Sequence, residues 1–269
     1  MELTDAIVVV TGGASGIGAA LARRFGAEGA AAVVVADLDA AGAERVALEI
    51  GSDRPRCRAV ARALDVASRD QVHTLVEEVT TELGPIDLFC ANAGIGTGAG
   101  VDAGDDRWEA IWQVNVMAHV HAAQALLPGW LERGRGYLLT TASAAGLLTN
   151  LGDAPYSVTK HAAVGLAEWL AITYGERGVR VSCLCPQGVR TPLLFGSLAD
   201  GELAAEVVKA QGVIEPEEVA EAVVAGLAEE RFLILPHPEV ARYEQARAAD
   251  HDRWIGSMRR LQARITGDR

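Results

Sequence analysis

The chain has 269 residues, of which 50% are hydrophobic and 22% are charged. This length is enough for one large core or two small ones, and the composition excludes a disordered protein. The net charge is −12, from 24 basic and 36 acidic residues, and no long basic stretch stands out. Nucleic acid and membranes are therefore not expected as partners, whereas a small-molecule substrate is.

The cysteines and the N-terminus indicate a reducing compartment. The apolar run that contains Cys183 and Cys185 is typical of a strand, which places both thiols on one face. The repeated C-x-x-C spacing of zinc ribbons is absent, and no cluster of His, Asp and Glu suggests a metal, so none is expected. The N-terminal stretch lacks a basic n-region, and no run of about 20 apolar residues occurs. We expect buried, reduced thiols and a cytoplasmic protein.

Short apolar runs alternate with longer stretches of helical periodicity along most of the chain. Strands are expected at 6–13, 31–37, 58–66, 86–94, 136–143, 179–186 and 231–236, and helices at 16–29, 40–51, 69–84, 107–134 and from 153 onward. This alternation predicts one α/β domain of the Rossmann type, a doubly wound, seven-stranded parallel sheet with helices on both faces. We expect it over residues 1–236, including a substrate loop at 190–214, with 237–269 as a helical C-terminal extension of the same domain.

The first predicted strand leads directly into a glycine-rich turn, "TGGASGIG" at 11–18. Glycines in the first strand–helix turn of such a sheet let the turn close, and they let main-chain N–H groups approach a pyrophosphate at the helix N-terminus. The turn therefore predicts a dinucleotide site. Its expected cofactor contacts are Gly12, Ser15, Gly16, Ile17 and Gly18.

An acidic residue closes the second predicted strand. Asp37 follows Gly18 by 19 residues, where a carboxylate accepts hydrogen bonds from the ribose hydroxyls of the adenosine. The same carboxylate would repel a 2′-phosphate, and the neighbouring positions Ser15 and Leu38 are not basic. We therefore expect NAD rather than NADP, with Asp37 and Leu38 beside the ribose. The alternative is an ordinary carboxylate in a turn at the end of a strand.

A tyrosine and a lysine lie four residues apart in "DAPYSVTKHAAVG", residues 153–165. The stretch has helical spacing, so Tyr156 and Lys160 share one helix face. A free phenol has a pKa of about 10 and is a poor base at neutral pH, but a nearby lysine cation favours the phenolate. The pair is therefore a candidate for an activated tyrosine. Taken alone, it is better read as a surface pair without chemical role.

Together these motifs resemble the short-chain dehydrogenase/reductase family, over about residues 5–236. The matching segments, in the order of the family, are "TGGASGIG" (11–18), "LDV" (64–66), "NAG" (92–94), "WQVNVMAH" (112–119), "TTAS" (140–143) and "YSVTK" (156–160). One segment departs from the family pattern. Where the family commonly has P-G-x-V-x-T, this chain has "PQGVRT" at 186–191, with Gln187 in place of glycine.

The resemblance implies a catalytic set of Asn115, Ser143, Tyr156 and Lys160. Tyr156 would act as acid and base, and Ser143 would hydrogen-bond the substrate oxygen. Lys160 would lower the pKa of Tyr156 and hold the nicotinamide ribose, while Asn115 would fix a kinked helix and a water of a proton relay. The remaining implied cofactor contacts are Asp65 and Val66 at the adenine, Asn92 and Gly94 after the fourth strand, and Val189 and Thr191 at the nicotinamide carboxamide.

The function implied is hydride transfer between NAD and a secondary alcohol or ketone. The loops expected around the nicotinamide contain Leu147, Leu148, Leu151, Leu193, Leu194 and Phe195. These side chains predict an apolar or weakly polar substrate, unless they simply pack a lid. A non-catalytic NAD-binding regulator or scaffold on the same fold is an alternative, as is isomerase or epimerase chemistry, which usually comes with a larger C-terminal domain.

Family members commonly form homodimers or homotetramers through helices equivalent to 107–133 and 156–175. The tail 237–269 reads as an amphipathic helix that seeks a partner surface. His119 and His121 lie on the long predicted helix, where we expect surface or interface positions rather than metal ligands.

Overall fold

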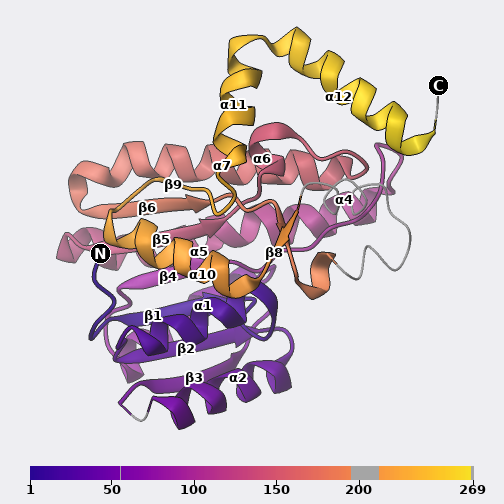
Figure 1. Cartoon of the computed structure of the whole chain (residues 1–269). Helices are drawn as coiled ribbons and strands as arrows, with labels where there is room; N and C mark the ends of the chain where they lie inside the picture. The colour runs from indigo at the N-terminus through magenta and orange to yellow at the C-terminus, as the bar shows by residue number, and fades with distance from the viewer. Residues whose placement is uncertain (55, 195–211, 268–269) are drawn as a thin grey trace.

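The computed structural model describes residues 1–54, 56–194 and 212–267. Its centre is a seven-stranded sheet in which every pairing is parallel, in the order β3-β2-β1-β4-β5-β6-β9 (Figure 1). The strands are β1 (Ile7–Thr11), β2 (Ala32–Asp37), β3 (Arg58–Ala63), β4 (Leu88–Ala91), β5 (Gly136–Thr141), β6 (Val179–Leu184) and β9 (Leu233–Ile234). The predicted seven-stranded parallel sheet is confirmed.

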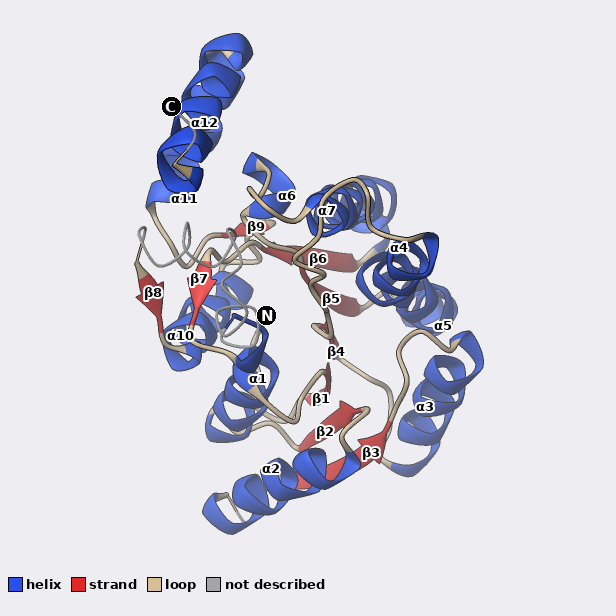
Figure 2. Ribbon diagram, turned by 90° about the vertical axis from the view of Figure 1, so that its right-hand side faces the viewer, coloured by secondary structure: helices blue, strands red, loops and turns tan. Residues whose placement is uncertain are grey.

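Helices cover both faces of the sheet, as expected (Figure 2). Successive side chains of a strand point to opposite faces, so Val8 and Val10 pack into one core and Val9 into the other. The core of Val8 and Val10 is closed by α1 (Gly16–Ala27), α2 (Ala40–Asp53) and α10 (Pro216–Ala228). The core of Val9 is closed by α3 (Arg69–Glu82), α5 (Ala118–Arg133) and α7 (Ala154–Tyr174). Helix α10 was not predicted from the sequence.

Several helices start where the sequence supplies a capping side chain. The Asp39 carboxylate accepts from the N–H of Gly42 at the start of α2. At the start of α7, Asp153 accepts from Tyr156, and Pro155 occupies the first turn, where its missing N–H costs nothing. These caps set the exact first residue of each helix, and at α7 they set the position of the predicted catalytic tyrosine.

The direction of winding reverses between β1 and β4. The chain runs outward through β2 and β3, returns to β4 beside β1, and continues through β5 and β6 to β9. In open parallel sheets, ligands bind beyond the carboxyl ends of the strands at such a reversal. The loops after β1, β4 and β5 meet there, and of the predicted site residues they carry Gly12, Ser15, Asn92, Gly94 and Ser143.

Two regions differ from the expectation. The stretch 107–134 is not one helix, because a π-helical turn (Gln113–Met117) separates α4 (Asp105–Trp112) from α5. In the predicted loop 190–214, β8 (Val213–Ile214) pairs in parallel with β7 (Gly188–Val189) as a second small sheet. Residues 195–211 of that loop lie outside the described residues.

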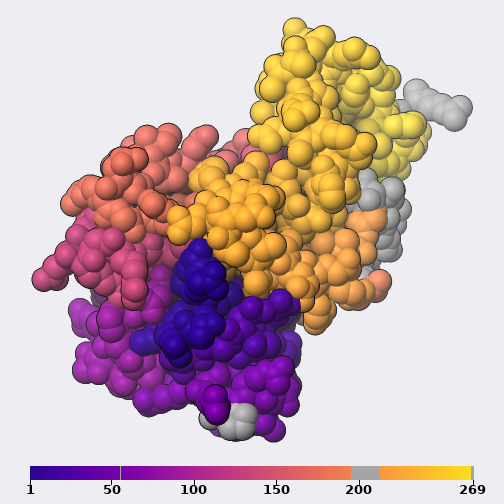
Figure 3. Space-filling model, turned by 60° about the vertical axis from the view of Figure 1, so that its left-hand side comes forward, coloured from indigo at the N-terminus to yellow at the C-terminus, as the bar shows by residue number. Residues whose placement is uncertain are grey.

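The predicted C-terminal extension consists of α11 (Glu239–Ala249) and α12 (His251–Thr266). Val240 of α11 is fully buried in the main core, and α11 contacts the short helix α6 (Ala145–Leu148). Helix α12 has no buried residue and projects from the body of the molecule (Figures 1 and 3). The extension is therefore anchored mainly at its start, with Trp254 of α12 also packing against the core.

The cysteines are free, buried thiols, as predicted. Cys183 of β6 and Cys185 just beyond its end are buried in the same core, and their sulfur atoms lie 3.8 Å apart. Within the part of the chain that the structure describes, no helix has the length and apolar character needed to span a membrane.

Candidate active site

The turn after β1 is built so tightly that it requires glycine. A Cβ at Gly18 would lie 2.0 Å from the Gly12 carbonyl oxygen, and one at Gly12 would lie 2.8 Å from Ala93 Cα. Gly12 and Gly16 also have φ of +66° and +51°, a backbone conformation that is strained for residues with a side chain. Ser15 makes no side-chain bond to the first turn of α1, so the N–H groups of that turn face the loop uncapped. This cradle, which a Cβ would fill, fits the pyrophosphate of a dinucleotide.

Asp37 ends β2 directly beside this turn. Its two carboxylate oxygens accept from the N–H of Ala14 and from that of Asp39, both at 2.9 Å. Leu38, the next residue, is exposed. The guanidinium of Arg45, which the sequence analysis did not single out, donates to the Ala14 carbonyl at 3.3 Å. A carboxylate and an arginine therefore flank the same turn of the loop.

Asn92 joins the ends of three strands. Its side-chain amide donates to the carbonyl of Thr11 at 3.0 Å and its carbonyl oxygen accepts from the Thr141 hydroxyl at 3.1 Å. Its main-chain N–H donates to the Thr11 hydroxyl at 3.0 Å. Asn92 therefore lies where the cofactor was predicted, and it also holds β1, β4 and β5 in register at their carboxyl ends.

The remaining predicted cofactor residues lie on two sides of the same sheet edge. Val66 is buried just beyond β3, and the Asp65 carboxylate accepts from the N–H of Ala67 at 2.9 Å. Val189 is buried in β7, and Thr191 lies against the phosphate loop, since its Cγ2 is 2.9 Å from a Cβ position at Gly16. The structure thus brings the segment 186–191 into contact with a turn 170 residues earlier.

Ser143, Tyr156 and Lys160 converge beyond the ends of β5 and β6. The Ser143 hydroxyl donates to the Pro186 carbonyl at 3.4 Å and accepts from the N–H of Ala145 at 3.1 Å, and it lies close enough to the Tyr156 hydroxyl to favour the phenolate. The ammonium of Lys160 lies 5.5 Å from the centre of the Tyr156 ring and donates to the Thr141 carbonyl at 3.0 Å. Two hydroxyls and a buried cation are therefore gathered in one place.

Asn115 reaches this group from the π-helical turn. Its side chain is fully buried and bonds the main chain of Ile95 twice at 2.9 Å, once as acceptor and once as donor, and it also donates to the Thr159 hydroxyl at 3.2 Å. A Cβ at Gly94 would lie 3.3 Å from both Asn115 Oδ1 and Lys160 Nζ. Gly94 therefore leaves the space in which the side chains of Asn115 and Lys160 approach each other.

The expected lowering of the tyrosine pKa by Lys160 is not seen in the protein alone. Burial raises the pKa of Tyr156, and the hydrogen bond with Ser143 opposes this only in part. Burial also lowers the pKa of Lys160 to about 8. The physical reason for both shifts is that the site excludes water, which disfavours phenolate and ammonium alike.

Asp153 belongs to the site although the sequence analysis did not name it as a site residue. Its buried carboxylate caps α7 and also accepts from the N–H of Thr97 and of Gly98, both at 2.8 Å, and from the Thr97 hydroxyl at 2.7 Å. It thereby fixes the loop after β4 against the helix that carries Tyr156. An aspartate two residues before a proline at a helix start was the available signal.

Known proteins resemble this chain in sequence and in fold. The family model for short chain dehydrogenase matches residues 6–200. The chain belongs to the short-chain dehydrogenase/reductase family. A 1-deoxy-11-beta-hydroxypentalenate dehydrogenase of Streptomyces exfoliatus is 35% identical to it over 243 residues, which cover 89% of this chain and 86% of the relative.

Two solved structures have the same fold. A short-chain dehydrogenase/reductase of Burkholderia phymatum in complex with NAD is 26% identical, with a TM-score of 0.85 over 94% of this chain and 96% of its own. A short-chain dehydrogenase of Sphingobium yanoikuyae in complex with NADPH has a TM-score of 0.79 over 93% and 95%, and its 23% identity shows the shared fold alone. As a member of this family, the chain is an oxidoreductase.

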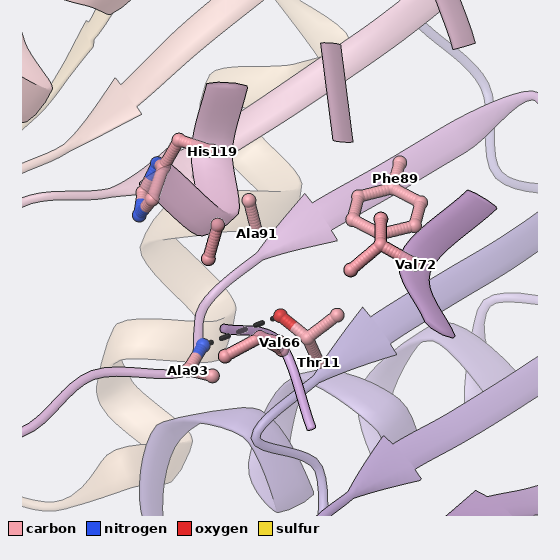
Figure 4. A pocket seen from close by; sticks show the side chains of 8 residues that line it. Thr11, Val66, Val72, Phe89, Ala91, Ala93 and His119 are labelled. Carbon is pink, nitrogen blue, oxygen red and sulfur yellow. Dashed lines mark hydrogen bonds between the residues drawn. The ribbon is translucent and has the colours of Figure 1, made fainter. Parts of the chain in front are cut away.

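The expectation that His119 and His121 lie at the surface of this short-chain dehydrogenase is wrong. Both are buried in α5, because that face of the helix packs on the sheet. His119 lines a small pocket with Thr11, Val66 and Ala93 (Figure 4). Among the described residues neither of its ring nitrogens has a hydrogen-bond partner, and burial, aided by Lys160, lowers its pKa to about 3. The imidazole is therefore neutral.

The leucines expected around the substrate have different positions in the dehydrogenase. Leu147 and Leu148 are buried in the main core, so the packing alternative holds for them. Leu193 is exposed, and its Cδ1 lies 3.8 Å from a Cβ position at Gly96 in the loop after β4. Leu151 and Leu194 are half-buried, and Phe195 lies outside the described residues.

The lowered pKa of Lys160 predicts a pH-dependent stability. The unfolded chain keeps this proton up to about pH 10.5 and the folded protein only up to about pH 8, so between these values the unfolded state binds more protons and stability rises with pH. From pH 7 to 9.5, wild type should gain about 2 kcal/mol of unfolding free energy relative to Lys160→Met. Urea denaturation of both proteins without cofactor measures this, and parallel pH profiles would contradict it.

Proposed function

We propose that this enzyme is an NAD-dependent oxidoreductase that interconverts a secondary alcohol and a ketone. The observation that carries the proposal is the convergence of the Ser143 and Tyr156 hydroxyls with the buried Lys160 ammonium, beside a glycine cradle that fits a dinucleotide. The bound nicotinamide would accept or supply the hydride. The protein supplies position and a route for the proton.

Tyr156 is the residue proposed to exchange a proton with the substrate oxygen. Its raised pKa keeps the phenol protonated near neutral pH, so that it can donate to a carbonyl oxygen. In the opposite direction the phenolate has to form, which an additional positive charge in the site favours. Ser143, whose hydroxyl lies beside it, is proposed to hold the same substrate oxygen and stabilise charge that develops on it.

Lys160 and Asn115 are proposed to support this proton exchange without contacting the substrate oxygen themselves. The Lys160 ammonium is fixed by the Thr141 carbonyl at 3.0 Å, and its pKa of about 8 allows it to lose and regain a proton. Asn115 adjoins it across Gly94. Its amide donates to Ile95 and Thr159, and its carbonyl oxygen accepts from Ile95. These bonds favour a role in fixing the π-helical turn that carries Asn115.

An apolar or weakly polar substrate is the proposed class. Leu193, exposed beside the loop after β4, supports an apolar wall. The Streptomyces exfoliatus relative is named for a substrate with a hydroxyl group, which agrees with an alcohol as substrate. A strict preference for phosphorylated or dicarboxylate substrates would contradict this class.

The reaction is tested by NADH formation, followed by absorbance across a panel of secondary alcohols, steroids and sugars. With any substrate that turns over, Tyr156→Phe should lower kcat by about a thousandfold, since the proton-exchanging hydroxyl is removed. Tyr174→Phe, at the far end of the same helix, is the matched control and should retain activity. Full turnover by Tyr156→Phe would refute the mechanism. No turnover across the panel with NADH still bound would leave two readings, a substrate outside the panel or the non-catalytic NAD-binding alternative.

The preference for NAD over NADP is proposed from Asp37. Its carboxylate accepts from the N–H of Ala14 in the loop, where it would repel the 2′-phosphate of NADP. The guanidinium of Arg45 lies at the same residue and would attract that phosphate if the Asp37 charge were removed. Asp37→Asn keeps an acceptor for the Ala14 N–H, so the loop should persist. The ratio of the Kd values for NADPH and NADH should fall about tenfold or more, as measured by fluorescence titration. Asp39→Asn, which changes the same charge two residues away, should leave the ratio unchanged.

A homodimer or homotetramer is proposed from an apolar surface on α7. Val158, Trp169 and Ile172 are exposed there at helical spacing, and Trp112 of α4 is exposed as well. Clusters of large exposed side chains of this kind mark association surfaces.

The cytoplasm is the proposed compartment, and the free state of the cysteines supports it.

The association surface is tested by light scattering coupled to size exclusion. Ile172 is 78% exposed, and Ile172→Glu should shift the protein to a smaller species because the introduced charge would be buried in the contact. Leu48→Glu is the matched control, since Leu48 is 68% exposed on α2, away from this surface. An unchanged mass for Ile172→Glu would rule out α7 as the contact.

A further inference from the structure

His237 is a buried histidine for which the mechanism above has no use. It is 3% exposed and lies between β9 and α11, at the first residue of the C-terminal extension. Proline precedes and follows it, at 236 and 238. Proline fixes its own φ and also restricts the residue before it, so the backbone presents this side chain with little freedom.

The imidazole continues the edge pairing of the sheet where the backbone can no longer do so. The N–H of Cys185 donates to the carbonyl of Ile234 at 2.9 Å. Pro186 then has no N–H to offer. The next N–H, that of Gln187, donates to Nδ1 of His237 at 3.1 Å. The imidazole thus accepts the hydrogen bond that a main-chain carbonyl of a longer β9 would have accepted.

The second ring nitrogen holds the following residue. Nε2 of His237 lies 3.1 Å from the carbonyl oxygen of Gly188, to which it donates. Because Nδ1 accepts and Nε2 donates, the ring is the neutral tautomer with its proton on Nε2. Burial lowers its pKa, against the opposing charges of Glu239 and Glu218, which agrees with a neutral ring. One imidazole therefore fixes both the N–H and the C=O of adjacent residues.

The segment held in this way links the two halves of the proposed site. On one side the Pro186 carbonyl accepts from the N–H of Ala144, next to Ser143, at 2.8 Å. On the other side the segment continues through Val189 of β7 to Thr191, which lies against Gly16 of the phosphate loop. A shift of residues 187 and 188 would move both ends.

We propose that His237 is a positioning residue for the cofactor. It clamps the main chain of residues 187 and 188, so that Val189 and Thr191 keep their place against the phosphate loop. The extension therefore contributes to the dinucleotide site through its first residue, at the point where Gln187 departs from the family pattern. The role in cofactor binding rests on the proposed function, whereas the clamp itself does not.

The test compares His237→Leu, His237→Asn and Val79→Ala in the full-length protein. Leucine removes both hydrogen bonds, whereas the Asn amide keeps an acceptor close to the position of Nδ1. Val79→Ala removes two buried methyl groups from α3 and leaves a cavity in the core, apart from residues 187 and 188. It therefore controls for a general loss of stability. NADH is the probe, titrated by fluorescence well below the melting temperature of each variant. Hydrogen exchange of the peptide that contains Gln187 is measured on the same samples without NADH.

We expect His237→Leu to raise the Kd for NADH at least tenfold, His237→Asn to raise it less, and Val79→Ala to leave it within twofold. Exchange at the Gln187 N–H should be at least tenfold faster in His237→Leu than in Val79→Ala. A Kd within twofold of wild type for His237→Leu would overturn the positioning role. If wild type itself does not bind NADH, the proposed function fails, and unchanged exchange at Gln187 would separately overturn the clamp.

Discussion

The hydrogen bonds of Asn92 at the carboxyl edge of the sheet are the constraint on which the site depends. Through Thr11 and Thr141, Asn92 ties together β1, β4 and β5 at the place where the winding of the chain reverses. Main-chain pairing alone brings the carboxyl ends of parallel strands to one edge of the sheet, whereas the loops that follow them need further contacts to hold their positions. Because the glycine-rich turn follows β1 and Ser143 follows β5, one amide sets the distance between the proposed dinucleotide cradle and the proposed catalytic hydroxyls.

The second feature of the site is that its charges are held at an energetic cost. Lys160 and Tyr156 lie where water is excluded, and burial shifts the pKa of each toward the neutral form. A buried ammonium whose pKa is about 8 destabilises the fold at neutral pH, and perturbed groups of this kind cluster at functional sites, in line with the proton exchange proposed for Lys160. The same low-dielectric surroundings strengthen the electrostatic effect of any charge that a bound dinucleotide brings into the site.

The supports of the site come from distant parts of the chain. Asp153 fixes the loop after β4 to the start of α7, and His237 fixes the segment after β6 to the start of the extension. Each makes several hydrogen bonds to main-chain groups of residues far away in sequence. Such bonds specify the position of a loop more sharply than apolar packing does, because they depend on direction as well as distance.

The sequence by itself determined the parallel sheet, the glycine turn and the family, because these depend on local spacing: apolar runs of strand length, glycine where a Cβ would collide, and Tyr156 and Lys160 on one helix face. The cap formed by Asp153 was also within its reach. Only the tertiary structure decided the rest. Leu147, Leu148 and His119 appeared available for function or surface contact, but they are buried, since burial depends on which helix packs over which strand. The role of His237 was hidden for the same reason, because its two partners lie about 50 residues away and meet it only once β9 has paired with β6.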